Sequence, residues 1–239
     1  MAKLLTTAYF PPVSYFAAIA EEMEGLIRIK GEDRRSIQSS PLSPSVIYIE
    51  ACENYQKQSY RNRCHFYAAD GKQALSFPII HEGGTHNRTI SEVRIDYSTP
   101  WVTQHKRAIT SAYRTSAYFE YYQDELFAIL DSQPEKLIDL NTRLLKFFLD
   151  KTGIKAEVRM TDAYVSENHI QESDLSRIIC EDLRESIHPK RPDTILQNLK
   201  LEKPYFQVFA EKHGFIPNLS IMDLLFNEGP DSIVFLKNI

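Results

Sequence analysis

The period of the apolar residues changes near Trp101, and this change constrains the fold more than any other feature. Before Trp101, short runs rich in β-branched residues have strand length, as in SVIYIEAC (45–52). After it, apolar residues recur at helical intervals, from Trp101 to Ala112 and again from Leu137 to Phe148. The pattern predicts an α/β protein in which a mixed sheet from the N-terminal half carries a largely helical C-terminal half packed on it.

The opening of the chain predicts a strand followed by a helix. KLLTTAYF (3–10) is rich in β-branched and aromatic residues and stops at Pro11-Pro12, which has no N–H to donate to a sheet. Apolar residues then recur at helical spacing between Val13 and Gly25. Residues 30–44 are polar and contain two prolines and four serines, so they predict a long loop, either a surface loop or one that closes over a site.

Turn residues and alternation indicate further strands. The Asp70-Gly71 pair is the strongest short-range hairpin signal in the chain and lies between two apolar runs within residues 61–80. EVRID (92–96) alternates between apolar and charged residues, which predicts a strand with one wet face. Residues 154–158 resemble one more strand, directly after Gly153 in the position of a helix-ending glycine.

Length and composition are those of an ordinary globular protein. The chain has 239 residues, 43% hydrophobic and 25% charged, which predicts a single domain spanning residues 1–239. No apolar run approaches the roughly 20 residues of a membrane span, and the N-terminal apolar stretch is too short for a signal peptide, so we expect a cytoplasmic protein. Cys52, Cys64 and Cys180 are odd in number and widely spaced, which suggests reduced thiols.

The charge balance bears on the partners. A net charge of −4 and a pI near 6.0 oppose a general nucleic-acid binder, because that affinity comes mainly from clustered Lys and Arg. A local basic stretch can still hold one phosphate or carboxylate with two or three donors. We therefore expect an anionic small-molecule partner and no nucleic acid, while the sequence specifies neither a cofactor nor an oligomeric state.

The stretch from Tyr55 to Arg63 is dense in cationic and aromatic side chains. If it is extended, alternation places Lys57, Arg61 and Arg63 on one face. Guanidinium groups and a lysine together suit an anionic small molecule, and Tyr60 would stack on a ring or fill the core. The competing interpretation is a solvated edge strand whose charges resist pairing with another strand.

Two further residues have both a functional and a structural interpretation. His105 lies on the apolar stripe of the helix that starts at Trp101, where a neutral imidazole acts as a general base or satisfies a core hydrogen bond. In the tail, Ser220 predicts the N-cap of a short helix, and capping would also explain Asp223 three residues later. The functional alternative is that Asp223 and Asn227, one turn apart, face a ligand.

Other familiar sites are disfavoured. His81, Glu82 and His86 flank two glycines, but their spacing matches no standard zinc pattern, so no metal site is expected. A phosphate-cradling G-x-x-x-x-G-K-[ST], a G-x-G-x-x-G turn, a G-x-S-x-G elbow and H-E-x-x-H are absent from the sequence. These absences disfavour an orthodox Rossmann dehydrogenase and a P-loop kinase.

Four segments together resemble the WbqC-like protein family of bacteria: TAYFPPVSYF (7–16), ENYQKQSYRNR (53–63), HKRAITSAYRTSAYFEYY (105–122) and KPYFQVFAEKHGFIPNLSIMDLLFNEG (203–229). The resemblance covers nearly the whole chain in the same order, and YQKQSYRNR and SIMDLLFNEG are its most specific parts. Members of that family occur among genes for surface polysaccharide, O-antigen and lipopolysaccharide synthesis. The resemblance implies an enzyme-like role in modifying an activated amino sugar.

The chain departs from the family at its opening motif, which reads His-Gln-Pro, one variable residue, then Tyr-Phe-Pro. Tyr9, Phe10 and Pro11 fit this pattern, but Leu5, Thr6 and Thr7 stand where His, Gln and Pro would be. The resemblance therefore favours other positions as site residues, namely Asn62, Arg63, His105, Tyr113 and Asp223.

The leading hypothesis is a transferase that moves a group onto the amine of a nucleotide-linked or otherwise anionic amino sugar. Lys57, Arg61 and Arg63 would hold its phosphates, with Tyr60, Asn62 and Tyr113 as further substrate contacts and His105 and Asp223 as catalytic residues. The alternative is a non-catalytic binding or scaffold paralogue that kept the fold but lost the chemistry of its N-terminal turn.

Overall fold

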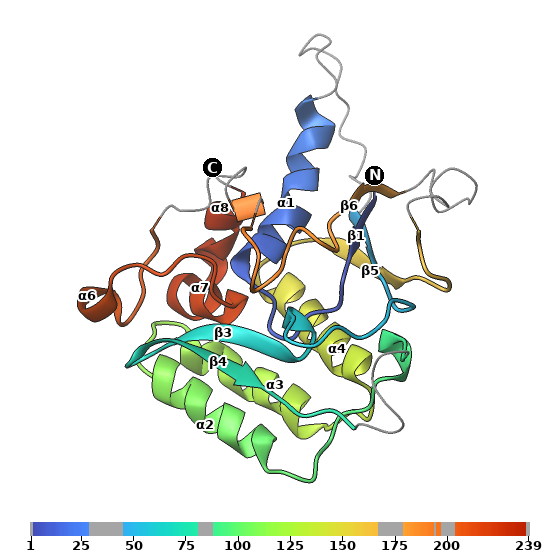
Figure 1. Ribbon diagram of the computed structural model, residues 1–239. Helices are drawn as coiled ribbons and strands as arrows, with labels where there is room; N and C mark the ends of the chain where they lie inside the picture. The colour runs from blue at the N-terminus through green and yellow to red at the C-terminus, as the bar shows by residue number, and fades with distance from the viewer. Residues whose placement is uncertain are drawn as a thin grey trace.

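The computed structural model of the chain describes residues 2–28, 45–80, 88–166, 179–193, 195–196 and 204–237 (Figure 1). The predicted loop at 30–44 and the residues His81, Glu82 and His86 lie outside these described residues. Within the described part, no helix is long and apolar enough to cross a membrane.

The first structural unit is a parallel four-stranded sheet with the order β5-β2-β1-β6. Its strands are β1 (Ala2–Leu5), β2 (Ser45–Ile49), β5 (Ala156–Met160) and β6 (Ile179–Asp182). Parallel neighbours need a crossover connection, and helix α1 (Val13–Arg28) lies between β1 and β2 along the chain. Because all the strands are parallel, their carboxyl ends meet at one edge of the sheet.

Alternate residues of this sheet enter two different apolar clusters. Leu5, Ile47 and Ile49 belong to the main core, whereas Leu4 and Tyr48 pack on the opposite face. Successive side chains of a strand point to opposite faces, so this division follows directly from the apolar runs in the sequence. The central strands β1 and β2 are therefore covered on both faces, as strands of parallel sheets usually are, while the edge strand β5 is largely exposed.

The second unit is an antiparallel hairpin of β3 (Arg63–Ala68) and β4 (Gly71–Ser76). Gly71 has a φ of +96°, a backbone angle that residues with a side chain rarely adopt. Ala68 pairs with Gly71 across the turn. The hairpin predicted from Asp70-Gly71 is confirmed. Strand β3 lies against α2 (Trp101–Tyr113) and α7 (Ile221–Glu228), so the hairpin covers the helical part of the protein (Figure 1).

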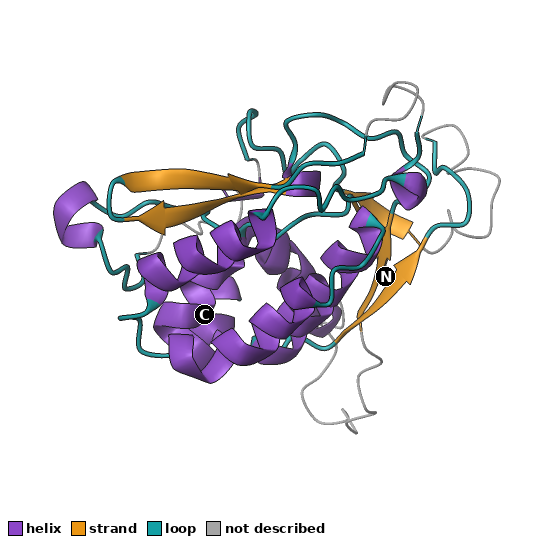
Figure 2. Cartoon of the chain, turned by 90° about the horizontal axis from the view of Figure 1, so that it is seen from below, coloured by secondary structure: helices purple, strands orange, loops and turns teal. Residues whose placement is uncertain are grey.

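Most of the other helices form one group beneath the hairpin, with the parallel sheet at its side (Figure 2). Besides α2 and α7 this group includes α3 (Phe119–Asp131), α4 (Leu137–Lys151) and α8 (Ser232–Leu236), whereas the short α6 (Ala210–His213) lies beside the turn of the hairpin. Single 3-10 turns are found at Tyr60–Asn62, Ile90–Glu92 and Gly229–Asp231. As predicted, Gly153 follows α4 with a φ of +75°, and the Ser220 side chain caps α7 by accepting from the N–H of Met222.

The α/β class is confirmed, with strands mainly from the N-terminal half and helices from the C-terminal half. Parallel and antiparallel pairing are found in two separate sheets. The strand predicted at 92–96 is wrong, because Arg94 and Ile95 form only isolated bridges, to Lys136 and Ile79. The sequence pattern also predicted no strand at β6, which completes the sheet beside β1.

Candidate functional site at the carboxyl edge of the parallel sheet

The strand order creates a switch point between β1 and β6. From β1 the chain adds β2 and then β5 on one side, and then returns to add β6 on the other side of β1. In open α/β sheets, ligands bind outside the carboxyl ends of the strands at such a point. The residues that follow these four strands are therefore the candidates for a binding site.

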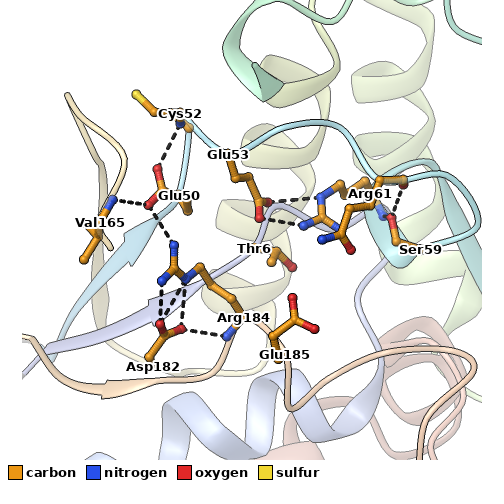
Figure 3. A network of polar contacts seen from close by, with 12 residues as sticks. Thr6, Glu50, Cys52, Glu53, Ser59, Arg61, Val165, Asp182, Arg184 and Glu185 are labelled. Atoms are coloured by element: carbon orange, nitrogen blue, oxygen red, sulfur yellow. Dashed lines mark hydrogen bonds and ion pairs between the residues drawn. The ribbon is translucent and has the colours of Figure 1, made fainter. Parts of the chain in front are cut away.

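Glu50, the first residue after β2, is fully buried and organises this edge (Figure 3). Its Oε1 accepts hydrogen bonds from the N–H of Cys52 at 3.0 Å and the hydroxyl of Thr161 at 2.6 Å. Its Oε2 accepts from the N–H of Val165 at 2.9 Å and from Nη1 of Arg184 at 3.2 Å. One carboxylate therefore holds together the segments that follow β2, β5 and β6.

Arg184, just beyond β6, connects Glu50 to Asp182. Its Nη2 donates to Oδ2 of Asp182 at 2.6 Å and its Nε to Oδ1 at 3.0 Å, while the guanidinium carbon lies 5.1 Å from the centre of the Tyr164 ring. Two carboxylates thus share one arginine. The charge of Arg184 is therefore already compensated, and the three side chains together carry one net negative charge, which makes them a poor receptor for a further anion.

A second ion pair joins Glu53 and Arg61. Nε of Arg61 donates to Oε1 of Glu53 at 3.0 Å and Nη2 to Oε2 at 2.6 Å, and both side chains are buried. Burial raises the pKa of the Glu53 carboxyl, and the charge of Arg61 opposes that rise. Arg61 is therefore committed to a buried pair.

These groups border a cavity of about 840 Å³, which we call the edge cavity. It is lined by Cys52, Glu53, Asn54, Gln56, Tyr164, Ser166, Asp182, Arg184 and Glu185. Each of its three carboxylates is paired with an arginine, Glu53 with Arg61, Asp182 with Arg184 and Glu185 with Arg191, and the adjoining carboxylate of Glu50 leaves one negative charge in excess, so this edge is mildly acidic. Among the residues that the structure describes, no group of three or more His, Cys, Asp or Glu side chains could hold a metal ion.

The stretch from Tyr55 to Arg63 is not extended, and the prediction of one cationic row is wrong. Gln58 has a φ of +59°, and residues Tyr60–Asn62 form a 3-10 turn. Lys57 is exposed, Arg61 is buried and Arg63 opens β3. The row fails because the Glu53–Arg61 pair turns one of its three cations inward.

Two predicted substrate contacts in this stretch have structural partners. Tyr60 is buried with its ring edge-on to His65, and Nδ2 of Asn62 donates to the carbonyl of Phe77 at 2.8 Å. Their roles in binding a substrate stay predictions.

His105 lies in the core between the hairpin and the N-terminal turn. Its Nε2 donates to the carbonyl of Ser76 at 3.2 Å, so its Nδ1 accepts from the hydroxyl of Tyr9 at 2.8 Å. Burial lowers the pKa of His105 to about 4. These contacts match the core interpretation, while its role as a base stays untested.

Asp223, on α7, is the acceptor of another buried hydrogen-bond network. Its Oδ2 accepts from the hydroxyl of Tyr205 and from Nε2 of Gln207, both at 2.7 Å. Burial raises the pKa of Asp223 to about 6, against the opposing effect of these hydrogen bonds. Tyr113, whose hydroxyl accepts from the N–H of Tyr67 at 3.2 Å, is also fully buried. Neither Asp223 nor His105 lines the edge cavity.

The sequence model of the WbqC-like protein family matches residues 43–235 of this chain. The chain belongs to the WbqC-like protein family. It is also 27% identical, over 206 residues, to the uncharacterized protein Rv1507c of Mycobacterium tuberculosis, a match that covers 80% of this chain and 87% of the relative. No solved structure matches the chain.

Segments that carry the family resemblance meet in the fold. The N–H of Tyr9 donates to the carbonyl of Tyr60 at 2.8 Å, joining the N-terminal turn to the stretch of residues 53–63. The N–H of Ile221 donates to the carbonyl of Pro11 at 2.9 Å, joining the same turn to the tail. Leu5, which stands where the resemblance to the family places a histidine, ends β1 and is fully buried. Thr6 follows it at the carboxyl end of β1 (Figure 3).

Proposed function

We propose that this protein is an enzyme of bacterial surface-polysaccharide biosynthesis that transfers a group onto the amine of an amino sugar bound in the edge cavity. The acidic lining of the cavity carries the proposal. Four carboxylates at this edge, those of Glu50, Glu53, Asp182 and Glu185, outnumber the three guanidinium groups paired with them, those of Arg61, Arg184 and Arg191, so the site favours a protonated amine over an anion. Membership of the WbqC-like family supplies the polysaccharide context.

The size and remaining lining of the cavity suit a sugar. Its volume of about 840 Å³ falls in the range of small-molecule sites, roughly 300–1,000 Å³. Tyr164 has 54% of its surface exposed and offers an aromatic face to a sugar ring. The amides of Asn54 and Gln56 can both donate to and accept from hydroxyl groups.

Transfer onto an amine requires that the ammonium first lose a proton. Glu53 is our candidate to accept it, because burial raises the pKa of its carboxyl and brings it closer to that of a useful base. Cys52 is a poor candidate for a covalent intermediate, since burial and the charge of Glu50 raise the pKa of its thiol and keep it protonated.

A nucleotide-linked substrate would place its phosphates outside the carboxylate-rich part of the cavity. We assign them to Lys57, which is exposed and follows the cavity residue Gln56 in the chain. Arg61 does not take part, because its Nε and Nη2 would both have to release Glu53 before the guanidinium could bind a phosphate. The catalytic roles of His105 and Asp223 stay predictions.

The proposal is tested by calorimetric titration with nucleoside-diphosphate amino sugars and their N-acetylated counterparts. The acidic cavity predicts that the compound with the charged amine binds more tightly. Glu185→Gln should remove about 1 kcal/mol of that preference, as expected for one partly exposed charge contact. Glu211→Gln, an exposed acid on α6, is the matched control. Equal affinity for amine and N-acetyl compounds would exclude the proposed substrate class.

The alternative, a non-catalytic paralogue, is favoured by the buried Leu5 in place of the family histidine. A Leu5→His variant would bury an imidazole in the core, so it is an ambiguous test of restored activity. Product formation by the unmodified protein, followed by mass spectrometry with acyl and glycosyl donors, is a cleaner test. Tight binding of the amino sugar without any product would support the paralogue.

A further inference from the structure

A groove of about 500 Å³ runs along the exposed face of α2, and we call it the α2 groove. Its lining contains three cationic side chains, Lys106, Arg107 and Arg114, and the ring of Phe127 from α3. Thr103, Thr110 and Ser111 supply hydroxyl groups. This surface shares no lining residue with the edge cavity and has the opposite charge.

The spacing along the helix brings two arginines to one side. Arg107, Ser111 and Arg114 are four and three residues apart, so they are neighbours on the helix surface. Seven residues of α-helix span about 10 Å, and two long arginine side chains can close on one group between them. The Ser111 hydroxyl lies between the two arginines as an additional donor.

Within the described part of the chain, neither Arg107 nor Arg114 forms an ion pair. Lys106 does form one, with Oδ2 of Asp131 at 2.6 Å, and its Nζ lies 5.3 Å from the centre of the Phe127 ring. The Lys106–Asp131 pair is largely exposed, and pairs of this kind contribute at most about 1 kcal/mol, so an incoming anion can compete with Asp131.

We propose that the α2 groove binds a phosphate group. Two guanidinium groups with an adjacent hydroxyl and a lysine match the donors that phosphate recognition uses, since arginine binds phosphate oxygens through paired hydrogen bonds. The phosphate belongs either to a small phosphorylated metabolite or to a phospholipid headgroup. The site is independent of the proposed function, because no residue of the edge cavity takes part in it.

The test follows amide chemical shifts in NMR titrations with inorganic pyrophosphate and, separately, co-sedimentation with phosphatidylcholine vesicles that contain phosphatidic acid. Arg107→Ala combined with Arg114→Ala should weaken binding at least tenfold, or about 1.4 kcal/mol. Lys146→Ala combined with Lys155→Ala removes the same charge from exposed positions elsewhere and should leave binding unchanged.

The pyrophosphate titration and the vesicle co-sedimentation together identify the molecule that carries the phosphate. Binding of pyrophosphate assigns the groove to a small phosphorylated molecule, whereas binding of the vesicles alone assigns it to a lipid headgroup. The proposal is overturned if neither probe binds, if both pairs of substitutions weaken binding equally, or if sulfate binds as tightly as pyrophosphate.

Discussion

Nη1 of Arg184 donates a hydrogen bond to Oε2 of Glu50 across 3.2 Å, and this contact joins the ends of two strands that are not neighbours in the sheet. Glu50 follows β2 and Arg184 follows β6, and β1 lies between those strands. The side chains are 0% and 8% exposed. The pair therefore spans the switch point and fixes the relative position of both sides of the edge cavity.

Glu50→Gln should destabilise the protein, because it leaves a buried guanidinium with one carboxylate instead of two. We expect a loss of about 3 kcal/mol in the free energy of unfolding, the lower end for a broken buried pair, since Asp182 still compensates Arg184. Urea denaturation measures the loss. Glu120→Gln, at an exposed position on α3, should change stability little, and equal effects of both substitutions would contradict the role given to Glu50.

Asp223 should make the protein less stable as the pH rises. Its pKa is about 6 in the folded protein and 3.8 in its ordinary state, so its contribution is fully present below pH 3.8 and is lost as the pH rises through 6. The two values correspond to about 3 kcal/mol. Asp223→Asn should therefore raise stability relative to the unmodified protein at neutral pH and change it less near pH 4. A stability difference that does not grow between those conditions would contradict a raised pKa.

His105 should have the opposite effect on stability, making the protein less stable as the pH falls. Burial lowers its pKa from 6.5 to about 4, so its contribution is present above pH 6.5 and is lost as the pH falls through 4. NMR of the ring nitrogens should show a neutral imidazole with the proton on Nε2 at pH 5.5, because Nε2 donates to Ser76. A ring that titrates near pH 6.5 would contradict the buried geometry and reopen a role as a base.

Tyr164→Ala should weaken substrate binding in the edge cavity by about tenfold, because an aromatic contact contributes roughly 0.5–1.5 kcal/mol beyond its buried area. Calorimetric titration with the nucleoside-diphosphate amino sugars named above measures this change. Tyr121→Ala is the control, since Tyr121 is 80% exposed and lies on α3, outside the lining of the cavity. No difference between the two variants would remove Tyr164 from the site.

Features that depend on neighbouring residues were predictable from the sequence. The Gly71 turn, the Gly153 helix end and the Ser220 cap each follow from local backbone chemistry, and the structure has all three. The strand expected at 92–96 failed because alternation reports which residues are buried and not whether a partner strand exists. Val93 and Ile95 are indeed buried, but their segment pairs only at single residues.

The candidate site was only partly predictable, because it depends on contacts between distant segments. The sequence predicts a role for Arg61 but not its pairing with Glu53, and the Glu50–Arg184 pair joins residues 134 positions apart. One signal was available: Glu50 is a carboxylate directly after an apolar strand, a position typical of sites in parallel sheets. Because β6 was not predicted, however, the sequence could not locate the switch point between β1 and β6.

The pairing of β1 with β6 has a consequence for how the protein acquires its site. Ala2 pairs with Ile179, so β1 is made well before β6, the strand that completes its sheet. Contacts between such distant residues form slowly, because closing the long loop between them costs conformational entropy before the contacts contribute any stabilising free energy. A nascent chain can therefore fold its hairpin with α2, α3 and α4 early, while the edge cavity is assembled only after β6 has been made.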